Sequence, residues 1–158
     1  QYFDTERNEN YVPYVVETSI GLDRMFLAIF SHCLKDEVLE DGSERVVLSL
    51  PPALAPVKAA ILPLVKKDGL PEFAKKIFDE LKCDFNVIFE EKDSIGKRYR
   101  RQDAIGTPFC ITIDHDSIND DSVTLRERDS MTQKRVKIED LRRIIDDKVN
   151  LRTLLTQI

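Results

Sequence analysis

The sequence predicts a three-layer α/β domain built on a mixed sheet of about five strands, and three observations support this prediction. Strand-like and helix-like segments alternate from residue 57 to residue 113, which is typical of parallel strands joined by helices. Three strand-like segments then follow one another between residues 109 and 138, which adds antiparallel strands. The chain has 158 residues, 42% of them hydrophobic and 34% charged, and this suffices for one globular domain with its own core.

The alternating half contains the clearest helix of the chain. The apolar run 57–65 predicts a buried strand that precedes it. Apolar residues then recur at helical spacing over 70–81, with charged residues opposite. Pro71 suits the first turn, because its missing N–H has no partner to lose there. Residues 85–89 predict the next strand.

A second helix and a run of strands complete the predicted domain. The helix is capped at Asp93 or Ser94, continues to about Ile105 and is broken by Gly106-Thr107-Pro108. The last helical region runs from about residue 141 to the C-terminus. Between the two, three segments alternate apolar and polar residues with period two, as strands do, and they are separated by Asp, Asn and Ser turns: 109–114, 123–126 and 135–138.

The first 45 residues form a separate unit in this interpretation. Residues 11–19 are β-branched and aromatic and predict a strand, and residues 20–30 predict a helix that is apolar on most of its circumference. Such a helix needs cover on nearly all sides. The acidic stretch 35–44 is interpreted as a linker or solvated loop, so the predicted division is 1–45 and 46–158.

Composition excludes several classes of protein. The chain carries a formal net charge of −5, has no apolar run long enough for a membrane span and lacks the layout of a secretory signal. Its three cysteines are widely spaced and odd in number, so we expect buried thiols in a reducing, cytoplasmic compartment and no zinc site. His115 is expected in a polar loop. Neither a Ser/His/Asp set nor a phosphate-binding glycine motif is present in the sequence, and no metal site is predicted.

Two segments carry residues suited to binding. The turn from Glu17 to Arg24 places a small polar residue and Gly21 at the mouth of a helix, where backbone N–H groups can approach an anion. A plain helix cap with a solvent-facing Arg24 explains the same residues structurally. The second segment, 92–101, carries five cations against one acid around Tyr99, and residues 126–137 are also basic. Cations with an interleaved aromatic residue suit a nucleic-acid surface.

For the basic segments, a solvated helix face or ion pairs with Asp103, Glu127 or Asp129 remain open alternatives. Because the whole chain is acidic, nucleic-acid binding that ignores sequence is disfavoured. The candidates for nucleic-acid contact are the cations that form the local excess of positive charge beside the predicted sheet: Lys97, Arg98, Arg101, Arg126 and Arg128.

Both segments resemble one family. Residues 12–24, VPYVVETSIGLDR, resemble the third signature motif of class II aminoacyl-tRNA synthetases in the form found in glycyl-tRNA synthetases. Residues 94–113 and 123–136 resemble the C-terminal anticodon-binding domain of the same enzymes. Thr18 and Tyr14 depart from the residues expected there, Pro and His. The resemblance implies a strand and helix from a catalytic domain, followed by a three-layer anticodon-binding domain.

The resemblance also implies roles for the motif residues. Residues at the end of the motif strand would hold glycine, with Glu17 at its ammonium group, and this set is Glu17, Thr18, Ser19, Ile20 and Gly21. Residues at the start of the helix would lie at ATP, with Arg24 against adenine or phosphate, and this set is Gly21, Leu22, Asp23 and Arg24. Mg²⁺ would accompany ATP in the full-length enzyme.

The implied parent is a homodimeric glycine-tRNA ligase that activates glycine with ATP and transfers it to tRNA, whose anticodon stem-loop is the partner of the C-terminal domain. The first two family motifs are absent from this chain, so we expect no complete catalytic set and no activity from it alone. Open alternatives are a synthetase for proline, threonine or histidine, a synthetase-derived module that only grips nucleic acid, and a flavodoxin-like binding domain.

Overall fold

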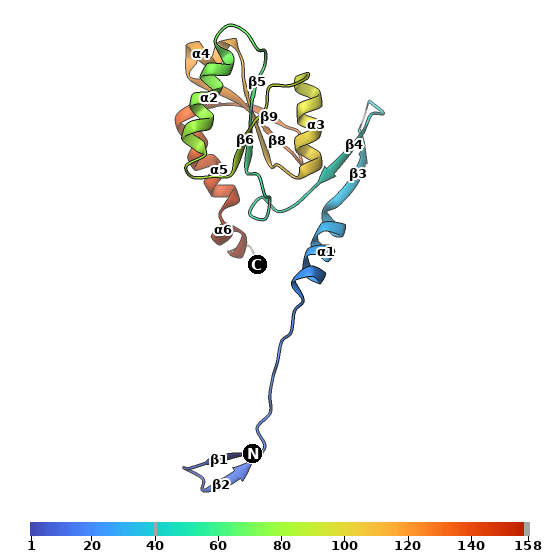
Figure 1. The fold of residues 1–158 in the computed structure, drawn as a ribbon, viewed down its shortest axis with the longest axis vertical. Coiled ribbons are helices and arrows are strands. Elements are labelled where there is room, and N and C mark those ends of the chain that lie inside the picture. The colour runs from blue at the N-terminus through green and yellow to red at the C-terminus, as the bar shows by residue number, and fades with distance from the viewer. Residues whose placement is uncertain (40, 157–158) are drawn as a thin grey trace.

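The computed structural model describes residues 1–39 and 41–156, and a five-stranded mixed sheet is the centre of the fold (Figure 1). The strand order is β6-β5-β7-β8-β9. β5 is parallel to β6 and β7, whereas β8 is antiparallel to both β7 and β9, which confirms the predicted mixed sheet. The strand bounds are Ala59–Pro63 for β5, Val87–Phe89 for β6, Phe109–Ile113 for β7, Ser122–Glu127 for β8 and Gln133–Lys137 for β9.

Helices cover both faces of this sheet and make the predicted three layers (Figure 1). α2 (Leu70–Leu81) and α5 (Leu141–Val149) pack on one face, and α3 (Ile95–Ile105) packs on the other. The short helices are α4 (His115–Asp120), the 3₁₀ turn η1 (Ile138–Asp140) and α6 (Leu151–Leu155). The loop expected around His115 is therefore a helix, which Asp114 and Ser117 stabilise with a reciprocal capping box.

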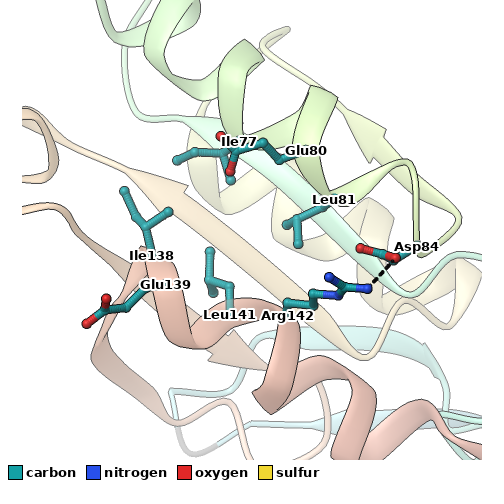
Figure 2. A pocket seen from close by; sticks show the side chains of 8 residues that line it. All are labelled: Ile77, Glu80, Leu81, Asp84, Ile138, Glu139, Leu141 and Arg142. Atoms are coloured by element: carbon teal, nitrogen blue, oxygen red, sulfur yellow. Dashed lines mark hydrogen bonds and ion pairs between the residues drawn. The ribbon is translucent and has the colours of Figure 1, made fainter.

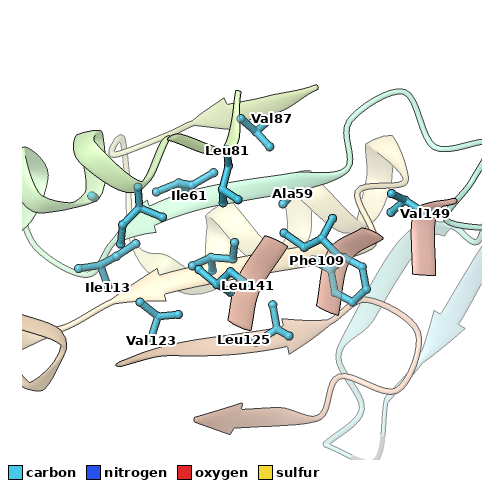
Figure 3. Packing of buried hydrophobic residues seen from close by; sticks show 14 of the residues in the cluster. Ala59, Ile61, Leu81, Val87, Phe109, Ile113, Val123, Leu125, Leu141 and Val149 are labelled. Atoms are coloured by element: carbon cyan, nitrogen blue, oxygen red, sulfur yellow. The ribbon is translucent and has the colours of Figure 1, made fainter. Parts of the chain in front are cut away.

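The core follows from the alternation of side chains along the central strands. Ala59 and Ile61 of β5 face the large cluster beneath α2 and α5 (Figure 3), whereas Ala60 and Leu62 face α3. All five residues of β5 and of β7 are buried, because these strands are covered on both faces. Burial on both faces explains why these two segments are almost continuously apolar in the sequence.

The N-terminal residues form less regular structure than expected. β1 (Tyr2–Asp4) and β2 (Glu9–Tyr11) make a small hairpin, and residues 12–21 have neither helix nor strand. The predicted strand over 11–19 is therefore wrong beyond Tyr11. A β-branched segment forms a stable strand only against a partner strand, and all residues from 11 to 30 are exposed.

The apolar helix of the N-terminal unit is present but uncovered. α1 (Leu22–Cys33) confirms the predicted helix, yet only Cys33 is buried in it. Phe26 and Leu27 are 66% and 62% exposed, respectively. The apolar circumference thus has no cover within the described residues.

The acidic stretch after α1 is a hairpin, so its interpretation as a linker is wrong. β3 (Leu34–Val38) pairs antiparallel with β4 (Glu44–Leu48). Val47 and Leu48 of β4 are buried, and β4 packs against α3. Because only one side of the hairpin packs against the domain, this stretch keeps many charged residues and its sequence does not resemble a strand. The predicted division between residues 45 and 46 falls inside β4.

Gly106 fits α3 against the hairpin. It ends α3 with a φ of +83°, and a Cβ added there would lie 3.0 Å from the Leu48 carbonyl oxygen. Only glycine adopts this conformation without strain and allows this approach. The end of α3 and the end of β4 are therefore in direct contact.

We expect Gly106→Ala to lower the free energy of unfolding by about 2 kcal/mol or more, through the strained φ and the contact with Leu48. The matched control is Gly96→Ala in α3, where a Cβ meets nothing within 4 Å. Because alanine forms helix more readily than glycine, this control should leave the free energy of unfolding unchanged or raise it by up to about 1 kcal/mol. Denaturant unfolding of both variants measures the difference, and equal effects would contradict the analysis.

Candidate nucleic-acid interface

Arg98 holds the ends of two strands together in the interior. It lies in α3 and is 2% exposed. Its guanidinium donates to the carbonyl oxygens of Pro63 at 2.7 Å, Leu64 at 3.3 Å and Glu90 at 3.1 Å, where β5 and β6 end. Burial lowers the pKa of Arg98 from its ordinary value, more than the nearby Glu90 raises it. This side chain fixes the first half of α3 to the sheet.

Asp103 is the centre of a second buried group. Its carboxylate is fully buried and accepts two hydrogen bonds from Arg126 of β8, at 2.7 and 2.9 Å. Arg45 of β4 donates a third, at 3.1 Å. The Arg126 guanidinium lies 4.7 Å from the centre of the Tyr99 ring, and the Tyr99 hydroxyl is 2.6 Å from that of Thr112. Burial alone would lower the pKa of Arg126, but the hydrogen bonds to Asp103 outweigh it and raise the pKa.

Arg128 is enclosed in the same region. It is 2% exposed and donates to the carbonyl oxygens of Gly106 at 2.8 Å and Leu50 at 2.7 Å, and it pairs with Asp129. The ion pairs with Asp103 and Asp129 that the sequence left open are thus present. We therefore assign Arg98, Arg126 and Arg128 to the interior of the fold and not to a nucleic-acid surface.

The remaining two of the five candidate cations lie at the surface. Lys97 is exposed in the first turn of α3. Arg101 is 41% exposed and pairs with Glu90 and with Asp93, at 3.0 Å from the latter. Only Lys97 and Arg101 of the five can therefore reach a ligand without disturbing the core.

A rim at the carboxyl ends of β5, β6 and β7 gathers further cations. We define this carboxyl rim as the loops 64–69 and 90–94, the start of α4 at 114–116, and Lys97. Lys66 pairs with Glu91 at 3.5 Å and His115 lies 3.9 Å from Asp68, so loop 64–69 contacts both of the other segments. The exposed cations of the rim are Lys66, Lys67, Lys92 and Lys97. In open parallel sheets, ligands bind beyond the carboxyl ends of the strands.

Two helices also begin at the carboxyl rim. α2 starts after Gly69 and α3 after Ser94, and neither residue caps its helix through a side chain. The first turn of α3 contains no acidic residue. Because the first N–H groups of a helix lack partners and carry partial positive charge, these helix starts favour anionic groups nearby. The rim therefore combines helix starts with four lysines. Its segments also carry six acidic residues, of which Glu90 and Asp93 pair with Arg101 and Asp114 pairs with Arg135.

Lys92 and Lys97 belong to the basic segment 92–101 that the sequence singles out, whereas Lys66 and Lys67 lie about 25 residues earlier and are not part of it. The rule that parallel strands end at one edge, applied to the predicted strands 57–65 and 85–89, would have placed them together.

The motif residues of the N-terminal segment are not gathered into a pocket by the described chain. Glu17, Thr18, Ser19 and Ile20 lie in the irregular exposed segment. Gly21 caps α1, and Leu22, Asp23 and Arg24 occupy its exposed first turn. Their assignment to glycine and ATP stays a prediction.

The cysteines are not poised for chemistry in the core. Burial raises the pKa of the Cys110 thiol to about 12, so this thiol stays protonated at neutral pH. Cys33 is also buried, as predicted, whereas Cys83 is exposed and the prediction of burial is wrong there. Across residues 1–39 and 41–156, no group of three or more His, Cys, Asp or Glu side chains is placed to hold a metal ion. In the same residues no helix is long and apolar enough to cross a membrane.

A groove lies between α2 and α5, beside the core. Figure 2 shows its apolar floor and the Arg142 side chain that crosses it to Asp84, at 2.8 Å. The cavity measures about 340 Å³ and is lined by three acidic residues, Glu80, Asp84 and Glu139, and one cation, Arg142. Three acids against one cation suit nucleic acid less well than the four lysines of the carboxyl rim.

Comparison with known proteins identifies the class of domain. The anticodon binding domain family matches residues 58–148, which span the sheet and most of α5. The chain belongs to this family. The RNA binding domain of threonyl-tRNA synthetase from Cryptosporidium parvum Iowa II has a similar fold, with a TM-score of 0.58 and 25% identity over 63% of this chain and 25% of that one.

The similar curated proteins are more specific. The chain is 53% identical to glycine-tRNA ligase of Borrelia hermsii over 89% of its length and 51% identical to that of Clostridium acetobutylicum over 94%. In both comparisons the matched region is 32% of the relative, so the chain spans about a third of these proteins.

We expect Arg126→Ala to destabilise the fold by about 3–5 kcal/mol, because it leaves the buried Asp103 carboxylate without its bidentate partner. Arg101→Ala is the matched control, since it removes ion pairs of an exposed side chain, and it should cost about 0–1 kcal/mol. Denaturant unfolding distinguishes the two, and a mild effect of Arg126→Ala would contradict an interior role.

A pH-dependent prediction follows from Asp114. Burial alone would raise the pKa of Asp114, but hydrogen bonds from Arg135 at 2.6 Å and from Ser117 outweigh it and lower the pKa. A lowered folded-state pKa gives stability that is complete above the unfolded pKa of about 3.9 and is lost as pH falls through the folded value. Asp114→Asn should therefore lower the free energy of unfolding by about 1 kcal/mol at pH 7.

The difference in free energy of unfolding between Asp114→Asn and the unchanged chain should shrink as pH falls below about 4. In this range Asp114 of the unchanged chain becomes protonated, so Arg135 loses its charged partner. Asp116→Asn, in the same helix, is the matched control. Thermal or urea unfolding from pH 7 to pH 2 measures both. A difference that stays constant with pH would show that the Asp114 charge contributes nothing.

Proposed function

We propose that this chain recognises the anticodon stem-loop of tRNA as part of a cytoplasmic glycine-tRNA ligase. The observation that carries the proposal is the identity of 51–53% to glycine-tRNA ligases over most of the chain. Membership of the anticodon binding domain family supports the same function for residues 58–148. The fold of the threonyl-tRNA synthetase domain, which binds RNA according to its description, is consistent with it.

The carboxyl rim is the proposed contact surface. Lys66, Lys67, Lys92 and Lys97 would meet phosphates there, and the uncapped start of α3 would add partial positive charge. Leu64 and Val65, each 38% exposed, offer apolar surface for unstacked bases between the cations. Arg101 would add a fifth phosphate contact by exchanging its ion pairs with Glu90 and Asp93 for an ion pair with phosphate. The net charge of −5 disfavours unspecific binding of nucleic acid by the chain as a whole.

For the whole enzyme we propose the parent reaction of the family, with homodimers, glycine, ATP and Mg²⁺ as in the resemblance. Glu17 would hold the ammonium group of glycine, and Arg24 would neutralise phosphate or stack on adenine because a guanidinium is planar and always charged. ATP supplies the adenylyl group that activates the carboxylate of glycine. In this chain these residues lie on one exposed segment, so we expect no glycine-dependent ATP–pyrophosphate exchange from it.

The test is binding of this chain, at fixed salt, to a tRNA stem-loop with a glycine anticodon and to one with that anticodon altered. We expect a preference for the first. The double variant Lys92→Ala/Lys97→Ala should weaken binding roughly tenfold or more, because each charged hydrogen bond contributes about 1.5–3 kcal/mol. It should also reduce the slope of log K against log salt by about two.

The matched control removes two lysines from the other end of the domain. Lys82 follows the last turn of α2, and Lys148 lies beside the start of β7. Lys82→Ala/Lys148→Ala should leave the affinity within about twofold, since neither charge lies near the rim and exposed charges are screened beyond about 10 Å. Equal losses in both double variants would contradict the rim as the contact surface. No preference between the anticodons would contradict anticodon recognition.

A further inference from the structure

Arg45 joins four parts of the structure through one side chain. Its Nε donates to Glu37 of β3 at 2.8 Å, and its Nη1 donates to Asp103 of α3 at 3.1 Å and to the carbonyl oxygen of Arg128 at 2.9 Å. The side chain itself is 1% exposed. A guanidinium presents its donors in a rigid fork, so these partners determine its position and plane together.

The hairpin that carries Arg45 is directly continuous with α1. β3 begins at Leu34, the residue that caps α1, and the Ser49 N–H donates to the Cys33 carbonyl oxygen at 2.7 Å. No flexible loop separates the helix from the hairpin. The orientation of the hairpin on the domain therefore sets the direction of α1.

The angle of the hairpin depends on its polar contacts. Val47 and Leu48 bury apolar surface against the domain, and such burial is not directional. Hydrogen bonds from a buried guanidinium to a carboxylate are directional and costly to break, because the unpaired charge would stay buried. Apolar packing alone therefore leaves the angle of the hairpin free to vary, and the contact from Arg45 to Asp103 restricts this angle.

We propose that Arg45 is a positioning residue that, through Asp103, fixes the direction of α1 relative to the anticodon-binding domain. The functional meaning rests on the proposed function, since α1 follows the segment with the glycine and ATP candidates. A helix of 12 residues is about 18 Å long, so a hairpin rotation of about 10° would move its first turn by about 3 Å. Displacements of about 1 Å can already cost an enzyme much of its rate.

The test measures the distance between α1 and the domain in the whole chain. Nitroxide labels are placed on the exposed native Cys83 and on Ala28→Cys in the exposed middle of α1, while Cys33 and Cys110 are buried and stay unlabelled. Pulsed electron paramagnetic resonance then gives the distribution of distances. We expect one narrow distribution in the otherwise unchanged chain.

Arg45→Met removes the fork but keeps an unbranched side chain, and it should widen the distance distribution at least twofold. Arg135→Met is the matched control, because it removes ion pairs with Asp114 and Asp120 at the two ends of α4 and contacts neither the hairpin nor the labelled residues, and it should leave the width unchanged. An unchanged width in Arg45→Met, or an equally broad distribution before substitution, would overturn the proposal.

Circular dichroism would reveal whether Arg45→Met folds. If it does not fold, a second variant tests the same proposal. Arg45→Lys keeps a positive charge near Asp103 but removes the planar fork, while the pair of Asp103 with Arg126 stays intact. It should widen the distribution to an intermediate degree, and no widening would overturn the proposal.

Binding of the anticodon stem-loop separates this inference from the proposed function. If Arg45 only positions α1, Arg45→Met should change the affinity less than twofold while the distances broaden. If the unchanged chain binds no stem-loop, the proposed function fails, yet the distance measurement still decides whether Arg45 holds the hairpin. A loss of affinity equal to that of Lys92→Ala/Lys97→Ala would overturn a purely positioning role.

Discussion

The fold depends on the charge of one fully buried carboxylate, that of Asp103. An ionised carboxylate without partners is strongly disfavoured in an interior, so Arg126 and Arg45 must both approach it. These arginines come from β8 and β4, and Asp103 itself comes from α3. Three elements that are distant in sequence are thereby held in one arrangement, which apolar contacts alone would specify less sharply.

This constraint explains why the basic segments turn inward. Arg98 holds the ends of β5 and β6, and Arg128 holds the turns around Gly106 and Leu50. Because these guanidiniums are used by the fold, the exposed positive charge of the carboxyl rim comes from Lys97 and from lysines in the loops after the parallel strands. Arginine serves the interior here because its fork can satisfy several acceptors, whereas lysine suits the mobile surface. Nucleic-acid binding at the carboxyl rim would then leave the core network undisturbed.

Periodicity predicted the parts of the fold that local physics controls. The bounds of α2 match the apolar spacing over 70–81, and β5 and β7 match the apolar runs. The hairpin β3–β4 was missed because its acidic residues resemble a loop, while the burial of Val47 and Arg45 depends on α3, about 50 residues away. The strand expected over 11–19 failed for the opposite reason: its composition favours a strand, but nothing in the described chain pairs with it beyond Tyr11.

By itself, the sequence determined the order of the five sheet strands with α2, α3 and α5, the mixed sheet and the family to which the chain belongs, because these follow from the spacing of apolar residues and from motifs of adjacent residues. Only the tertiary structure decided which cations face solvent. Arg98 and Lys97 are neighbours in the sequence, yet one is buried against strand ends and the other is exposed. Burial and charge pairing depend on residues that folding brings together from distant segments. The contacts of Asp103 with Arg45 and Arg126 are an example.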